Sequence, residues 1–107
     1  MKLLSELIDD ALETAQTCII LAIEAKDERR SLADILHGIS VDELRHAREL
    51  HCELIRLRAE HGEPSADMQT IYDYILRRRN EKAEEIERLQ ANFANQNVNL
   101  NAERLGK

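Results

Sequence analysis

The chain has 107 residues, enough for one compact domain, and its wealth of Leu, Ala, Glu and Arg excludes an extensive β-sheet. The formal net charge of −6 argues against binding to nucleic acid or to an anionic membrane. The longest apolar run, residues 18–23, is too short to span a membrane, and Cys18 and Cys52 form no CxxC pair. We therefore expect an all-α cytoplasmic protein with reduced thiols.

The first predicted element is a helix from about Lys2 to Lys26. The polar segment 26–30 that follows predicts a short turn, and an antiparallel helical hairpin is the simplest arrangement. The apolar residues of this helix recur at helical spacing along one side, and they are Leu4, Ile8, Ala11, Ala15, Cys18, Ala22 and Ala25.

A second helix is predicted from about Arg29 to Glu60, and Gly62 followed by Pro64 is typical of a helix end. Ser40 and Glu43 match a capping box, so a helix break there is an alternative, although the apolar stripe keeps its phase across the site. That stripe consists of Leu32, Ile35, Leu36, Ile39, Leu50, Leu54 and Leu57.

The third predicted helix occupies residues 63–95 and is capped by Ser65 or Asp67. Opposite charges one turn apart predict a largely solvent-exposed helix, and they include Arg77 with Glu81 and Glu84 with Arg88. The Asn-rich stretch that follows has little to bury, so we expect a flexible polar tail over residues 96–107. The apolar side of the helix consists of Met68, Ile71, Tyr72, Ile75, Ala83, Ile86, Leu89 and Phe93.

Two polar residues interrupt the apolar stripe of the second helix. On a helical wheel Glu43 falls near the centre of the stripe and His46 lies about 60° to one side. Burying a carboxylate is costly unless a charge partner or a metal compensates it. Because Glu and His three residues apart can ligate one ion, the hairpin over residues 1–62 predicts a metal site. A buried Glu43–His46 pair, or Glu43 as a helix cap, is the alternative.

The Glu-x-x-His element of Glu43 and His46, with Glu13 thirty residues before Glu43, resembles the ferritin-like di-iron superfamily. The chain is most similar to the short encapsulated ferritins and rubrerythrin-like proteins over residues 10–60. The resemblance implies that Glu13 is a ligand from the first helix, Glu43 a bridging carboxylate and His46 the nitrogen ligand. The family's frequent aromatic residue near the site is replaced by Ile20, so no tyrosyl electron-transfer role follows.

One chain supplies only half of the four Glu and two His of a di-iron centre. The resemblance therefore implies a homodimer, or a higher even-numbered oligomer, that completes a ferritin-like four-helix bundle and holds two Fe ions per dimer. Mn or Zn suits similar ligands, so the sequence leaves the metal open.

The position of Glu13 leaves two interpretations open, because on the wheel it lies nearly opposite the Ala-rich stripe of its helix. Its polar side either faces the metal site of a partner, or Glu13 is merely solvated, in which case Asp10 or Glu24 is a substitute ligand. His51 lies on the flank of the stripe of the second helix and is a weaker candidate ligand.

The leading functional hypothesis is a ferroxidase that oxidises Fe(II) and serves iron sequestration. Storage would require a ring, a cage or an enclosing shell. If the tail over residues 97–107 docks to an encapsulin-type shell, the chain would lie inside a protein nanocompartment. One alternative is a non-catalytic helical interaction module with a structural Glu–His pair. Another is a di-iron or di-manganese oxidase or peroxidase acting on an organic substrate.

Overall fold

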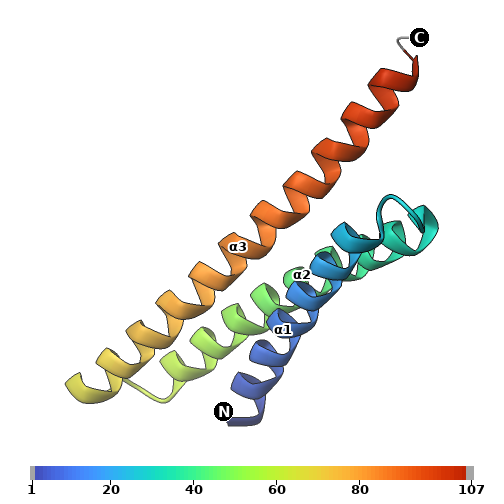
Figure 1. The fold of residues 1–107 in the computed structure, drawn as a ribbon. Helices are drawn as coiled ribbons and strands as arrows, with labels where there is room; N and C mark the ends of the chain where they lie inside the picture. The colour runs from blue at the N-terminus through green and yellow to red at the C-terminus, as the bar shows by residue number, and fades with distance from the viewer. Residues whose placement is uncertain (1, 106–107) are drawn as a thin grey trace.

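The computed structural model describes the backbone of residues 2–105 and the side chains of residues 2–96. Three helices follow one another, α1 (Lys2–Ala25), α2 (Arg30–Glu60) and α3 (Ala66–Leu105) (Figure 1). The described backbone contains no strand, so the prediction of an all-α fold is confirmed. A four-helix bundle formed by two copies stays a prediction.

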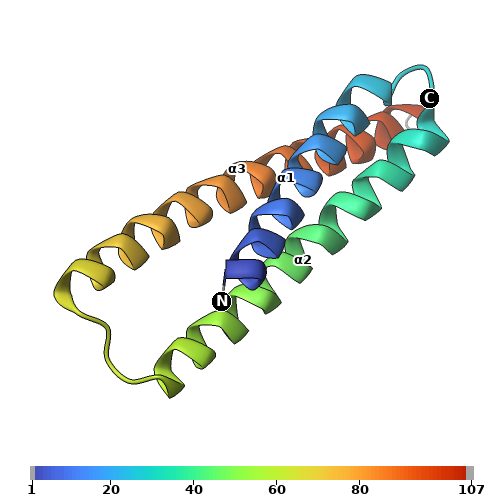
Figure 2. The ribbon, with the colours of Figure 1, turned by 90° about the horizontal axis from the view of Figure 1, so that it is seen from below.

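The helices α1 and α2 form an antiparallel hairpin with the most extensive contact in the molecule. The third helix, α3, runs back along the hairpin, antiparallel to α2, and its C-terminal part extends past the hairpin end (Figure 1). Seen from below, α2 runs along one side of α3 and α1 crosses α3, while the segment 61–65 bridges α2 to α3 (Figure 2). Within the described part of the chain, no helix is both long and apolar enough to cross a membrane.

The helix ends follow the signals in the sequence. Glu60 is the last residue of α2, and Gly62, two residues later, adopts a left-handed conformation with φ of +91° that is typical of a helix end. The Ser65 hydroxyl accepts a hydrogen bond of 3.2 Å from the Met68 backbone amide, so Ser65 caps α3. The alternative of a helix break near Ser40 is wrong, because α2 is continuous there.

The third helix is longer than the sequence predicted. Its described backbone stays helical to Leu105, ten residues beyond the expected end at residue 95. The expected flexibility of the tail over 96–107 stays a prediction, since the side chains of 97–107 and the whole of 106–107 lie outside the described residues.

Buried apolar residues form two clusters along the hairpin. Small residues dominate its interface, and Ala15, Ala22 and Ala33 are 0 % exposed, which lets the two helices approach closely. The larger cluster contains Ile8, Ala11, Leu12, Ala15, Leu44, Ala47, Leu54, Ala83 and Ile86. The smaller one contains Ile19, Ala22, Ala33 and Phe93.

The buried face of α2 differs from the predicted one. Its buried residues are Ala33, Ser40, Leu44, Ala47 and Leu54. Part of the predicted core stripe faces outward, since Leu32, Ile35 and Ile39 are 43 %, 59 % and 41 % exposed. A buried polar contact holds this rotation, because the Ser40 hydroxyl donates to the Ala15 carbonyl at 2.7 Å and accepts from Gln90 Nε2 at 2.9 Å.

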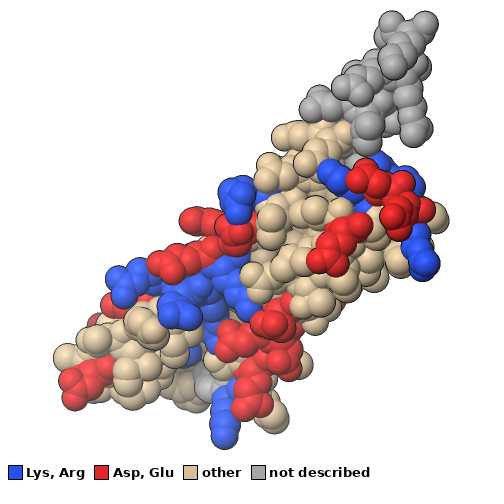
Figure 3. Space-filling model, viewed as in Figure 1, with Lys and Arg blue, Asp and Glu red and all other residues tan. Residues whose placement is uncertain are grey.

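Charged side chains attach α3 to the hairpin, where Lys and Arg gather and Asp and Glu flank them (Figure 3). Arg79, which is only 7 % exposed, bonds Asp9 at 2.8 Å and also donates to Ser5. The predicted pairs within α3 do not form among the described side chains; Arg88 pairs instead with Glu85 at 2.5 Å. Arg79 of α3 therefore connects this helix to α1 instead of facing solvent.

Candidate metal centre

A groove runs between α1 and α2, and no described residue of α3 lines it. We call it the outer groove, and its lining is Leu7, Asp10, Ala11, Thr14, Glu43, His46, Glu49, Leu50, Cys52 and Glu53. Four carboxylates and one imidazole thus share one concave surface. Carboxylate oxygens with an imidazole nitrogen are typical ligands of divalent transition metals.

Glu43 and His46 meet within this groove, one helical turn apart on α2. Glu43 Oε1 lies 3.2 Å from His46 Nδ1. The Arg45 guanidinium lies 3.3 Å from the other ring nitrogen, Nε2, and can only donate. Nε2 therefore accepts, and Nδ1–H donates to Glu43. The expected proximity of the two groups is confirmed.

The pair is not buried within a single chain, contrary to the sequence expectation. The side chains of Glu43 and His46 are 31 % and 45 % exposed. The reason is the rotation of α2 described above, which turns the stripe around Glu43 away from the α1–α2 interface. The hairpin alone therefore needs no metal to compensate a buried charge.

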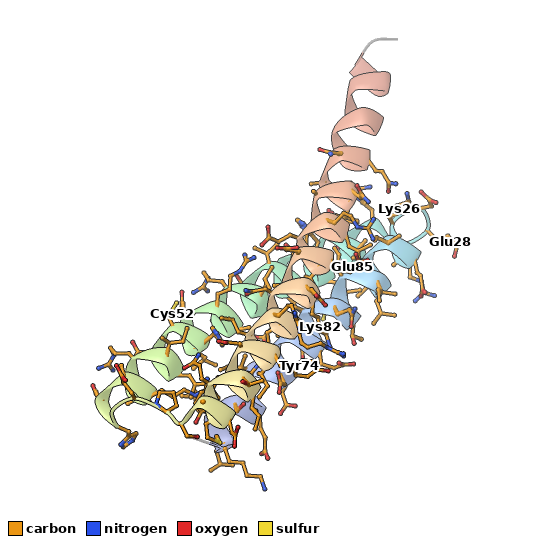
Figure 4. All side chains as sticks on the ribbon, turned by 90° about the vertical axis from the view of Figure 1, so that its left-hand side faces the viewer. Lys26, Glu28, Cys52, Tyr74, Lys82 and Glu85 are labelled. Atoms are coloured by element: carbon orange, nitrogen blue, oxygen red, sulfur yellow. The ribbon has the colours of Figure 1, made fainter. Side chains whose placement is uncertain are left out.

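The first-helix acid that accompanies this pair is Asp10. Asp10 lines the outer groove together with Glu43 and His46. Glu13 lies elsewhere: its Oε2 accepts from Lys82 Nζ of α3 at 2.7 Å, and Figure 4 shows Lys82 on the side of α3 that faces α1. Glu24 does not line the groove. The structure thus does not bring Glu13 together with Glu43 and His46 in one chain.

Apolar side chains continue the same face beyond both ends of the acidic centre. On α1 they share one helical face with the groove residues Asp10 and Thr14, because Leu3, Leu7, Asp10 and Thr14 are three or four residues apart and Leu21 follows Thr14 by seven residues, two helical turns. We call these exposed apolar side chains, Leu3, Leu7, Leu21, Leu32, Ile35 and Ile39, the outer stripe; they are 41–76 % exposed. Exposed apolar side chains gathered on one face are typical of an interface.

The two cysteines are free thiols, as expected. Burial raises the pKa of the Cys18 thiol, and the neighbouring Glu43 carboxylate raises it further. Cys18 is consequently a protonated thiol near neutral pH and a poor ligand. Cys52 is exposed and lines the outer groove.

Within the described side chains of one copy, no three His, Cys, Asp or Glu residues are placed to hold a metal ion together. Comparison with family models, with curated proteins and with solved structures finds no match. The similarity to ferritin-like proteins therefore rests on the spacing of Glu43, His46 and the first-helix acids alone. A metal centre built from the described side chains would need ligands from more than one copy, or rearranged side chains.

Sequence reasoning did not reveal that Arg79 and His51 bury polar atoms. The third helix was predicted to be largely solvent-exposed, yet its Arg79 is buried against α1. His51, a weak ligand candidate, has both ring nitrogens buried without a hydrogen-bond partner. The spacing of Asp9 and Arg79, seventy residues apart, gives no local signal that could have revealed the contact.

Proposed function

We propose that two copies of this chain pair through their outer faces and that Asp10, Glu43 and His46 of both copies hold two metal ions between them. The observation that carries the proposal is the pattern of this face: a carboxylate and imidazole centre flanked on both sides by exposed apolar side chains. Pairing would cover the outer stripe and would remove the acidic centre from water. Buried carboxylates without cations would then be unfavourable, so pairing and metal binding support each other.

The donor set suits an ion bound by Glu43 and His46. Glu43 Oε1 and His46 Nδ1 already lie 3.2 Å apart, and the ion would replace the proton that His46 Nδ1 donates to Glu43. Asp10 would contribute a second carboxylate from α1. The set contains no thiolate, which favours iron or manganese over metals that prefer sulfur ligands.

We further propose Fe(II) oxidation as the activity, with iron as the substrate and iron sequestration as its role. Oxygen-rich ligands stabilise Fe(III), so a pair of adjacent ions can give up electrons to dioxygen or peroxide. Glu49 and Glu53 line the same groove, where Arg45 and Arg56 pair with them. An enclosing ring, cage or shell would be required to store the product.

The second candidate function is a metal-free interaction module. The hydrogen bond from His46 to Glu43 satisfies both groups without an ion, and it could fix how two hairpins align. This alternative predicts a dimer that contains no stoichiometric metal.

Metal content and Fe(II) oxidation by metal-stripped protein separate these functions. We expect wild type to bind about one ion per chain and to oxidise Fe(II), and we expect Glu43→Gln and Asp10→Asn to lose both properties. Glu13→Gln is the matched control and keeps both, because Glu13 contacts Lys82 rather than the groove. Metal retained in Glu43→Gln would refute the metal centre. If Glu13→Gln loses metal and Fe(II) oxidation while Asp10→Asn keeps both, the role of Asp10 is refuted but that of Glu43 is not.

A further inference from the structure

A second cavity lies between all three helices, and its chemistry is opposite to that of the outer groove. It has a volume of about 250 Å³ and is lined by Ile8, Leu12, Ala47, Arg48, His51, Cys52, Arg79, Asn80 and Ala83. No Asp or Glu occurs in this described lining, whereas four side chains carry N–H donors. The cavity is thus rich in donors and lacks carboxylate acceptors.

Arg79 carries the strongest hydrogen-bond donor of the cavity that lacks an acceptor. The guanidinium is 7 % exposed; its Nε and Nη2 donate to Asp9 and Ser5. Its third nitrogen, Nη1, is buried and has no partner among the described side chains and backbone. A buried N–H of a charged group that lacks an acceptor is unfavourable, so Nη1 marks a place for an acceptor.

His51 lines the same cavity and is also unsatisfied, since both of its ring nitrogens are buried without a partner. Burial lowers the pKa of His51, and the positive charges of Arg79 and Arg58 lower it further, outweighing the effect of Asp9. The imidazole is therefore neutral near pH 7, and it offers one N–H in a positive electrostatic environment.

Arg48 and Asn80 complete the donor set. Arg48 forms an ion pair with Glu87, a residue that does not line the cavity. Asn80 is exposed, so its amide can reorient at little cost. Neither residue brings a carboxylate into the cavity.

We propose that this cavity binds a small oxoanion of the size of inorganic phosphate. The anion accepts hydrogen bonds from Arg79 Nη1 and from the N–H of His51, and Arg48 and Asn80 bond its remaining oxygens. Asp9 and Glu87 pair with Arg79 and Arg48 from outside the lining, so the argument for an anion rests on the unpartnered donors. Water would also fill a polar space of this size, but an anion accepts charge-assisted hydrogen bonds from Arg79 Nη1, which are stronger than those that neutral water accepts. A volume of about 250 Å³ suits a small oxoanion.

Titration of metal-stripped, full-length protein with inorganic phosphate, followed by NMR, tests the proposal. We expect saturable shifts of the His51 ring and of the Arg79 side-chain resonances, with a millimolar or lower dissociation constant. His51→Phe and Asn80→Leu should each weaken binding at least about tenfold, one hydrogen bond's worth. His61→Gln, which changes an exposed histidine at the end of α2, is the control and should bind like wild type.

Each outcome decides the proposal. Unchanged His51 and Arg79 resonances at saturating phosphate would overturn it, as would a bound water detected at His51 without any effect of phosphate. Equal binding by wild type, His51→Phe and Asn80→Leu would also overturn it, because the phosphate would then lie elsewhere on the surface. Titrations with sulfate and acetate report which oxoanions the cavity accepts. Binding of either anion by wild type, with loss of that binding in His51→Phe, supports the proposal.

Discussion

Replacing Ile35 by serine should weaken association of two copies far more than it affects the fold of one. Ile35 belongs to the outer stripe and is 59 % exposed in the single chain. Complete burial of an isoleucine side chain contributes about 1.5–3 kcal/mol, so covering the exposed part is worth about 1–1.5 kcal/mol. A symmetric dimer buries the residue twice, which gives about 2–3 kcal/mol, or an increase of about 30- to 150-fold in the dimer dissociation constant.

Sedimentation equilibrium measures this change directly. Ile55→Ser is the matched control, because Ile55 is 48 % exposed but lines the cavity between α2 and α3 instead of the outer groove. We expect Ile55→Ser to associate like wild type. Equal dissociation constants for Ile35→Ser and Ile55→Ser would refute the assignment of the outer stripe to the dimer interface.

Two further predictions concern the interior. Ser40→Ala removes the acceptor of Gln90 and the donor to Ala15, so urea denaturation should show that the free energy of unfolding falls by about 1–2 kcal/mol. Ser31→Ala, at an exposed position, should cause no measurable change. A loss in Ser40→Ala no larger than that in Ser31→Ala would mean that the contact does not stabilise the fold. The pKa of His51 is lowered in the folded chain, so the unfolded chain binds the proton more readily and the free energy of unfolding should fall as pH drops below about 6.5. This group contributes at most about 1.4 kcal/mol per pH unit to that slope, and His51→Phe should remove its contribution. An identical slope in wild type and His51→Phe would contradict the lowered pKa of His51.

Much of the fold could be predicted from the sequence because its signals are local. The helix ends at Gly62 and Ser65 depend on backbone conformation and capping within a few residues, and both are confirmed. The antiparallel hairpin likewise follows from two amphipathic segments joined by a short polar turn.

The orientation of α2 could not be predicted because two faces of this helix are apolar enough to pack. The larger side chains Leu32, Ile35 and Ile39 marked the stronger stripe in the sequence, yet the face with Ala33 and Ala47 contacts α1. Small residues permit close approach of helices, an advantage that a hydrophobicity pattern does not reveal.

The candidate site was predicted in part for the same reason. Glu43 and His46 meet because residues three apart on one helix are neighbours whatever the tertiary structure. The choice among first-helix acids depends on how α1 is turned against its neighbours, and Glu13 lies on the flank that contacts Lys82 of α3. Asp10, named from the sequence as a substitute, is the candidate first-helix acid that lines the same groove as the pair.

Native mass spectrometry of the full chain, with and without Fe(II), tests the central claim most directly, because one spectrum reports both the number of chains and the number of metal ions. We predict dimers, or larger even-numbered assemblies, that carry two iron ions per pair of chains, and we predict that Glu43→Gln abolishes the iron. Monomers, or dimers whose iron content is the same in wild type and Glu43→Gln, would contradict the claim that paired outer faces form a metal centre.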